Sequence, residues 1–371
     1  MRSHDLRHAG LSRLHSRGSI AVSLLVLFAL CAGPVSAQSL ARFSVDSAIS
    51  VDHFAGQNTV DRPNIVVDVT GVMRLGRGWR VYLRPWFRQP RAPMWNKQLY
   101  QAGLQYEQGG PISTRVDLGY IVSPIGLGMM DARPDVNPTI GGHSSYFSPM
   151  PVFEPGAPRV QPIASTYPLG GQFTASTPKW DARAALITSP PNRTYVLNTS
   201  SPNPPARPII VAGGGVTPKT GLRLGMGIAT GEYAKGSELT PRSDKGRGFT
   251  LVSTEAEYAF GYTKLAGEVT RDVLETAIGS ETAYGWFLQG SQTLSPRWFV
   301  AARQEGTNTP PLRTRVSVGP RRSFHITEAT VGFRLSTEIT LRGSFVARKS
   351  YTRTAWDQQV GTSLVWTRRW W

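Results

Sequence analysis

Cysteine and long apolar runs are both scarce in this chain of 371 residues. The one cysteine, Cys31, lies near the N-terminus in a segment that we expect to be removed, which leaves no disulfide and no cysteine-ligated metal. After residue 37, no stretch approaches the roughly 18 consecutive apolar residues of a membrane-spanning helix. Helical periodicity is also nearly absent, and the sequence therefore predicts an all-β protein.

Catalytic signatures are missing as well. Only three histidines follow residue 37, namely His53, His143 and His325, and none has the spacing of a metal-binding H-E-x-x-H pair. The chain contains no G-x-S-x-G motif of the kind that places a nucleophilic serine. We therefore expect no enzymatic activity, no metal and no cofactor.

Acidic residues are outnumbered. Without residues 1–37, which carry four Arg and one Asp, the chain has 37 basic and 23 acidic residues, a net charge of +14. Thirty of these basic residues are arginine and seven are lysine. Such an excess fits nucleic acid, an acidic surface or an anionic solute. The N-terminal segment described next indicates export, which argues against nucleic acid as the partner. For an exported barrel, the remaining partners would be lipopolysaccharide phosphates at the outer rim or anions in the lumen.

Residues 1–37 have the pattern of a signal peptide. Four basic residues open it: Arg2, Arg7, Arg13 and Arg17. The apolar stretch from Ile20 to Ala32 is too short to span a bilayer comfortably. Because Val35-Ser36-Ala37 fits the small-x-small cleavage rule, the mature chain is expected to begin at Gln38. A transmembrane anchor is the alternative interpretation.

Apolar and polar residues alternate in sixteen stretches of the mature chain. We expect strands at 43–54, 62–75, 78–88, 97–107, 112–122, 170–178, 180–188, 208–217, 219–230, 248–260, 262–274, 281–293, 296–306, 324–335, 338–349 and 355–370. The stretches 170–178 and 208–217 alternate least clearly, and without them fourteen strands remain. The gaps are short and long in turn, which is typical of a membrane barrel with tight turns at one rim and long loops at the other.

The alternation defines two faces but does not tell which face is wet. In 338–349, Leu341 and Phe345 share one face, whereas Arg342 and Ser344 share the other. Aromatic residues cluster near strand ends, as the interfacial girdles of a membrane barrel require. They are Trp79, Tyr100, Tyr106, Tyr120, Trp180, Tyr258, Phe260, Trp298, Trp356 and Trp366. We therefore predict one transmembrane antiparallel up-and-down β-barrel over residues 38–371, with apolar faces outward.

The mature chain resembles a Gram-negative outer-membrane porin over nearly its whole length. The resemblance rests on the signal peptide, the alternating stretches, the regular order of short and long connections, and the terminal Trp370-Trp371. The passage 116–128 also resembles the wall-to-loop passage of phosphate-selective and related porins. The resemblance implies passive diffusion of small hydrophilic solutes across the bacterial outer membrane, recognition of the last strand by the barrel assembly machinery, and a homotrimer. The basic residues are mainly arginine rather than the lysine expected of a phosphate specialist, which leaves the solute open.

Several arginines fall on the face that would line the lumen. They are Arg74, Arg80, Arg84, Arg88, Arg223 and Arg342, and three of them recur every four residues on one strand. Arginine stays charged and presents five donors in a planar fork, so a ring of arginines in a water-filled pore favours anions. The alternative is that they pair with inward acids, such as Asp181, Glu255 and Glu328, and stiffen the wall without selecting a solute.

The segment 123–169 is the longest gap between strands. In sixteen-strand porins the connection between strands five and six folds into the channel, so the resemblance implies that this segment is a constriction loop. Loops of this length are usually functional or disordered. It carries five charged residues that we single out: Asp131, Arg133, Asp135, Glu154 and Arg159. We expect its acids to face the arginine wall and create a transverse field, and the alternative is a loop that rests on the outer rim.

Two hypotheses of other classes remain open. A barrel hydrolase would need Ser, His and acidic groups that converge at a rim, and the sequence offers no such set. An adhesin or structural barrel would bind a partner through its loops and have a plugged lumen. In that case the basic loops 231–247 and 307–323 would bind lipid phosphates, and a correctly folded sample would show no conductance.

Overall fold

The computed structural model describes residues 43–56, 63–91, 94–127, 133–161, 167–193, 208–314, 316–353 and 355–370. The expected signal peptide, the expected start at Gln38, and Asp131 lie outside the described residues. No helix within these ranges is long and apolar enough to cross a membrane. The described part of the chain includes two short helices, α2 (Ser144–Phe147) and η3 (Gly236–Glu238).

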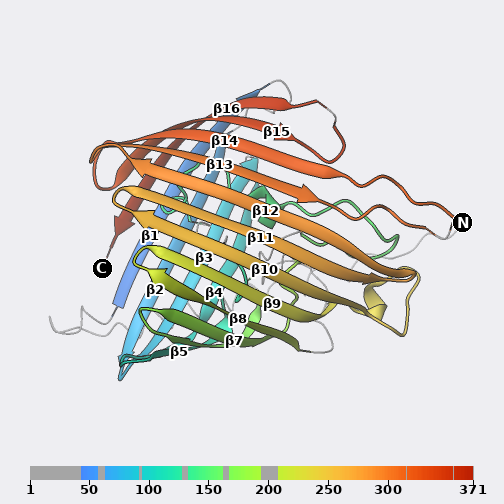
Figure 1. The fold of residues 1–371 in the computed structure, drawn as a ribbon. Coiled ribbons are helices and arrows are strands. Elements are labelled where there is room, and N and C mark those ends of the chain that lie inside the picture. Colours follow the sequence, from blue (N-terminus) through green and yellow to red (C-terminus); the bar gives the residue numbers. More distant parts are fainter. Residues whose placement is uncertain are drawn as a thin grey trace, which may run out of the picture. The chain divides into compact units, whose positions relative to one another are not determined.

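Sixteen strands form one closed antiparallel barrel, in which each strand pairs with its neighbours in sequence and β1 pairs with β16 (Figure 1). The strands are β1 (Phe43–Gly56), β2 (Pro63–Gly76), β3 (Trp79–Arg91), β4 (Met94–Gln108), β5 (Ser113–Tyr120), β6 (Leu169–Ser176), β7 (Trp180–Ile187), β8 (Ile209–Lys219), β9 (Leu222–Ala234), β10 (Arg247–Phe260), β11 (Thr263–Thr276), β12 (Gly279–Thr293), β13 (Trp298–Asn308), β14 (Ser323–Arg334), β15 (Ile339–Lys349) and β16 (Asp357–Arg369). Every predicted strand is present, including the two weakest, so the barrel has sixteen strands rather than fourteen.

Tight turns follow the even-numbered strands, as the gap lengths predict. We call this end of the barrel the short-turn rim and the other end the long-loop rim. At the long-loop rim, the connections expected at 89–96 and 275–280 are reduced to two residues each, because strand pairing continues outward until Arg91 pairs with Met94 and Thr276 pairs with Gly279. Continued pairing satisfies backbone donors and acceptors that a loose loop would leave to water.

The two faces of the barrel have the polarity opposite to that of a soluble sandwich. In β15, Leu341 and Phe345 are 40% and 48% exposed, whereas Arg342 and Ser344 are each 6% exposed. The pattern continues on other strands, where Val269 and Val331 are exposed and the neighbouring Glu268 is buried. The prediction that apolar side chains point outward is therefore confirmed.

Large aromatic side chains gather at the short-turn rim, where strands begin or end. Exposed members of this girdle are Trp79, Trp180, Phe260, Tyr262, Trp298 and Trp370. Amphipathic rings at this level suit the boundary between hydrocarbon and water. The girdle therefore marks one edge of the outward apolar band.

Charge placed on the outward face is expected to destabilise the barrel according to its depth. Phe345 lies midway along β15, so Phe345→Lys should lower the free energy of unfolding by about 2–4 kcal/mol. Leu335 is exposed in the turn between β14 and β15, and Leu335→Lys should cost only about 0–1 kcal/mol. Urea titration in lipid vesicles measures both values, and equal costs would contradict a lipid-facing β15.

Candidate functional site

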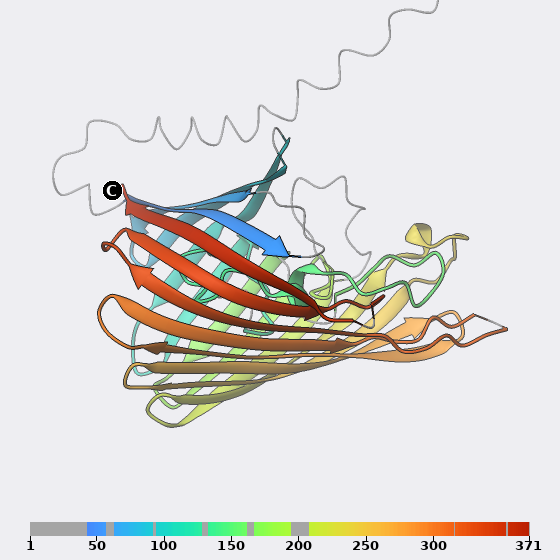
Figure 2. The ribbon, with the colours of Figure 1, turned by 90° about the horizontal axis from the view of Figure 1, so that it is seen from above.

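The long loop between β5 and β6 lies against the inner wall of the barrel. Its helix α2 contacts β12 and β13, and other residues of the loop bond to charged side chains on β10, β11, β14 and β15. In two views at right angles, the green segment that carries α2 lies between the blue strands and the orange strands (Figure 2). The described part of the loop is therefore folded inward, as the resemblance to sixteen-strand porins implies.

Glu328 and Arg303 hold the middle of the loop. Glu328 Oε1 accepts hydrogen bonds from the backbone N–H groups of Ile140, at 2.8 Å, and Gly141, at 3.1 Å. Arg303 Nη1 and Nη2 donate to the carbonyl oxygens of Gly141 and Gly142, at 2.9 and 3.2 Å. The two wall side chains also pair with each other at 3.0 Å, so both charges are neutralised although both are buried.

Arg342 holds the tip of the loop. Its Nη1 donates to the carbonyl oxygens of Pro134, Asn137 and Thr139, at 3.1, 2.8 and 2.9 Å, and its Nη2 donates to Ser363 Oγ at 2.9 Å. The sequence places Arg342 among the pore-lining residues. The structure instead encloses it behind the loop, where it fastens loop to wall and presents little charge to water.

Glu268 of β11 holds the start of the loop and α2. Its Oε2 accepts from the backbone N–H of Leu127 at 2.8 Å and from the Tyr146 hydroxyl at 2.6 Å, while its Oε1 accepts from Ser253 Oγ at 2.8 Å. This carboxylate is 2% exposed and lacks an arginine partner among the described residues. The three hydrogen bonds stabilise the buried carboxylate in the absence of an arginine partner among the described residues.

Two acids of the loop have arginine partners, and the third expected acid, Asp131, lies outside the described residues. Glu154 pairs with Arg247 of β10 at 2.7 Å, and the backbone N–H of Ala277 donates to the same carboxylate. Asp135 pairs with Arg133 of its own loop at 2.9 Å. Arg159 is exposed. The expected transverse field between the loop acids and the arginine wall therefore stays a prediction.

The three β3 arginines are not a row of free charges. Arg84 is 6% exposed and makes a bidentate contact with Asp68, with its Nε 2.9 Å from Oδ1 and its Nη2 2.7 Å from Oδ2. Arg80 pairs with Glu107. Arg88 is exposed and donates to the neutral side chain of Asn64 at 2.6 Å.

Farther along the wall, charges are also paired. Arg223 of β9 contacts Asp181 at 2.8 Å and Glu255 at 2.9 Å, and Arg183 also contacts Glu255 at 2.8 Å. Arg74, near the end of β2, is exposed and makes no ion pair within the described ranges. Of the six predicted pore-lining arginines, Arg74 and Arg88 therefore keep charges that no carboxylate compensates among the described residues.

The C-terminal end of the loop packs against the wall through a stack of aromatic rings, which the sequence analysis did not predict. Tyr167 stacks on Tyr100 with ring centroids 4.3 Å apart, Tyr100 stacks on Trp86 at 4.9 Å, and Arg84 lies 5.6 Å from the Tyr100 ring. Burial raises the pKa of Tyr167 to about 12, so its hydroxyl remains neutral. The register of β4 shifts where it carries Tyr100, and this extra residue carries no signal in the alternation.

No family model matches the chain, and no curated protein matches it in sequence. Solved structures match it in fold. The OmpF of Salmonella typhi in complex with daunomycin has a TM-score of 0.54 at 10% identity and covers 88% of this chain and 97% of its own. The fold is that of a sixteen-strand porin.

Two further porin-fold structures match comparably. The trimer form of OmpT, an outer-membrane protein of Vibrio cholerae, has a TM-score of 0.53 at 9% identity, covering 88% of this chain and 99% of its own. An anion-selective porin from Comamonas acidovorans has a TM-score of 0.50 at 13% identity, covering 88% and 98%. At such identities the likeness concerns the fold alone.

Removal of one wall carboxylate is expected to loosen the loop. Glu328→Ala deprives the N–H groups of Ile140 and Gly141 of their acceptor, so their hydrogen exchange should become at least about tenfold faster. Exchange mass spectrometry of a peptide that spans residues 133–143 measures this. Asp181→Ala, which removes a wall carboxylate that contacts Arg223, is the matched control. Unchanged exchange in Glu328→Ala, or equal acceleration in both variants, would contradict the anchoring role.

Proposed function

We propose that this protein is a porin of the bacterial outer membrane, through which small hydrophilic solutes diffuse passively and anions pass preferentially. One observation carries the proposal: charged side chains line the interior of a closed sheet whose outer face is apolar. A barrel with this polarity is stable in a bilayer and can hold a water-filled lumen. Transport then follows the solute gradient and needs no catalytic step, metal or cofactor.

The segment 123–169 is the proposed constriction. Wall side chains bind its described part at several points, as Glu268, Glu328 and Arg342 do. A loop tied to the wall in this way occupies a fixed part of the lumen, so it sets an upper size for solutes. The same hydrogen bonds keep the constriction from swinging out to the long-loop rim.

The proposed anion preference rests on arginines that no carboxylate compensates. A paired wall such as that formed by Arg84, Arg223 and Arg303 contributes little net field, because each positive charge has a negative neighbour. Arg74 and Arg88 are exposed at opposite ends of the lumen and have no such neighbour among the described residues. Their fields extend into water and attract small anions to both mouths.

The proposed partners follow from the surroundings of such a barrel. Small anionic or polar solutes pass through it, and lipid covers its outward face. Lipopolysaccharide phosphates are proposed to contact basic residues near the long-loop rim, such as Arg242, Lys245 and Arg321. We also propose folding by the barrel assembly machinery, which would recognise the aromatic last strand, export by the signal peptide, and assembly as a homotrimer.

Reversal potentials in planar bilayers under a salt gradient test the anion preference. The unaltered protein is expected to prefer chloride over potassium. The double variant Arg74→Gln/Arg88→Gln should reduce the chloride to potassium permeability ratio by about two- to fourfold, since a unit charge at roughly 10 Å in water contributes about 0.4 kcal/mol.

A charge-neutral double variant is the matched control. Asp181→Asn/Arg223→Gln removes one acid and one base of the same wall pair, so the ratio should stay close to that of the unaltered protein. A preference for potassium in the unaltered protein would refute the assignment of charge. Equal effects of the two double variants would mean that overall wall polarity, rather than uncompensated charge, sets the selectivity.

A further inference from the structure

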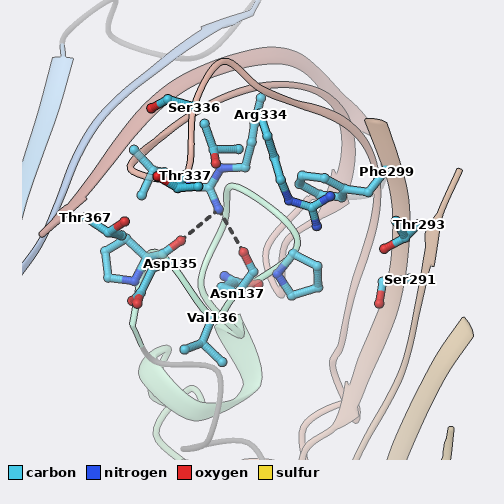
Figure 3. A pocket seen from close by; sticks show the side chains of 15 residues that line it. Asp135, Val136, Asn137, Ser291, Thr293, Phe299, Arg334, Ser336, Thr337 and Thr367 are labelled. Atoms are coloured by element: carbon cyan, nitrogen blue, oxygen red, sulfur yellow. Dashed lines mark hydrogen bonds between the residues drawn. The ribbon is translucent and has the colours of Figure 1, made fainter. Parts of the chain in front are cut away.

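A cavity of about 410 Å³ lies between the tip of the long loop and the wall near the short-turn rim (Figure 3). We call it the rim cavity. Its loop side is formed by residues 134–138, and its wall side by β12 to β16 with the turn between β14 and β15. The volume falls within the range of about 300–1,000 Å³ that is typical of small-molecule sites.

Arg334 lies on an aromatic platform in this cavity. Phe299 of β13 pairs directly with Gly332 of β14, and a Cβ at position 332 would collide with the Phe299 ring. Because glycine stands there, the ring can lie over the neighbouring strand. The Arg334 Cζ lies 5.0 Å from the centroid of that ring, so the guanidinium is held by a cation–π contact (Figure 3).

Arg334 forms no ion pair with a wall carboxylate among the described residues. Its Nη1 donates to the carbonyl oxygen of Pro296 at 3.2 Å, and within the described ranges no carboxylate forms an ion pair with it. Arg84 and Arg303 differ, since each has a buried carboxylate partner. Arg334 is half-buried, which leaves donors of its planar fork for an oxyanion such as a carboxylate.

Most of the remaining lining is hydroxyl groups and apolar surface, together with Asn137 and with Arg342, whose Nη1 donates to carbonyl oxygens of the loop tip. The hydroxyls belong to Ser291, Thr293, Ser336, Thr337, Thr340 and Thr367, and the apolar surface to Pro134, Val136, Pro138, Phe299 and Val365. Hydroxyls both donate and accept, so they match the hydroxyls of a sugar, and apolar side chains match the C–H face of its ring. Asp135 also lines the cavity, but its ion pair with Arg133 offsets its charge.

We propose that the rim cavity is a solute subsite for monosaccharides that carry one carboxylate. The carboxylate would receive hydrogen bonds from Arg334, while the ring rests between the loop tip and Phe299 and its hydroxyls meet those of the wall. The subsite rests on the proposed function in that a solute reaches the cavity through the lumen. The subsite would favour one class of solute, sugars with a carboxylate, whereas the lumen charges alone would attract any small anion.

Three ligands test the chemistry on the unaltered protein. D-glucuronate and D-glucose differ in that the first has a carboxylate where the second has a hydroxymethyl group, and acetate has the carboxylate without the ring. Titration calorimetry of the refolded protein in detergent should give glucuronate a Kd at least about tenfold lower than that of glucose or acetate. Equal affinity for glucuronate and glucose would overturn the role of Arg334, and equal affinity for glucuronate and acetate would overturn the role of the hydroxyl lining.

Variants locate the binding. Arg334→Gln should weaken glucuronate binding about tenfold and leave glucose unaffected. Phe299→Leu keeps the charge but removes the platform, and should weaken glucuronate severalfold. Arg297→Gln removes an equal charge from an exposed turn residue outside the lining, and should leave the Kd unchanged.

An unchanged Kd in Arg334→Gln, or an equal loss in Arg297→Gln, would refute the subsite. If Arg334→Gln fails to fold, Phe299→Leu and the ligand comparison decide the question in its place. Potassium chloride conductance of the unaltered protein separates the two proposals. Conductance without a glucuronate preference rejects the rim subsite alone, whereas a folded protein that does not conduct rejects the channel itself.

Discussion

Closure of the backbone hydrogen-bond ladder is the constraint on which this barrel depends. A strand in hydrocarbon cannot leave its N–H and C=O groups unpaired, because no water reaches them. The first and last strands meet this requirement by pairing with each other from Asp46↔Arg369 to Gly56↔Gln359. Once the sheet is closed, alternation assigns every second side chain to the outer face and the others to the interior. In this closed sheet Leu341 lies on the outer face and Arg342 in the interior, and this order is the inverse of that in a soluble barrel.

A second constraint is the pairing of the backbone groups of the long loop inside the barrel. The long loop brings backbone donors and acceptors into the barrel without a sheet or a long helix to pair them, and most buried backbone groups in proteins are paired. Wall charges supply what is missing: Glu328 accepts from two N–H groups, and Arg342 donates to three carbonyl oxygens. Four of the six arginines that alternation singles out, Arg80, Arg84, Arg223 and Arg342, are thus bound to a wall carboxylate or to the loop.

The strands could be predicted because their signal is local. The sequence predicts even β6 and β8, although Gly170, Gly171 and the glycines at 213–215 weaken the alternation there. In the structure, each of these two strands pairs with a neighbouring strand on both sides. The loop anchors could not be predicted in the same way. Glu328 meets Ile140 across 188 residues of sequence, and Arg342 meets Asn137 across 205. Alternation tells which way a side chain points, but not which distant backbone group it meets.

The cost of burying charge explains where selectivity can reside. An uncompensated charge in a dry interior is strongly unfavourable, so a buried arginine such as Arg303 requires a carboxylate such as Glu328. Each such pair has little net field, and a wall built from pairs discriminates weakly between ions. Near the rims, water solvates a guanidinium directly, so Arg74, Arg88 and Arg334, which have no carboxylate partner among the described residues, can keep their charge at little cost. The groups able to attract an anion should therefore lie at the two mouths of the lumen, and the buried middle of the wall should serve mainly to hold the loop.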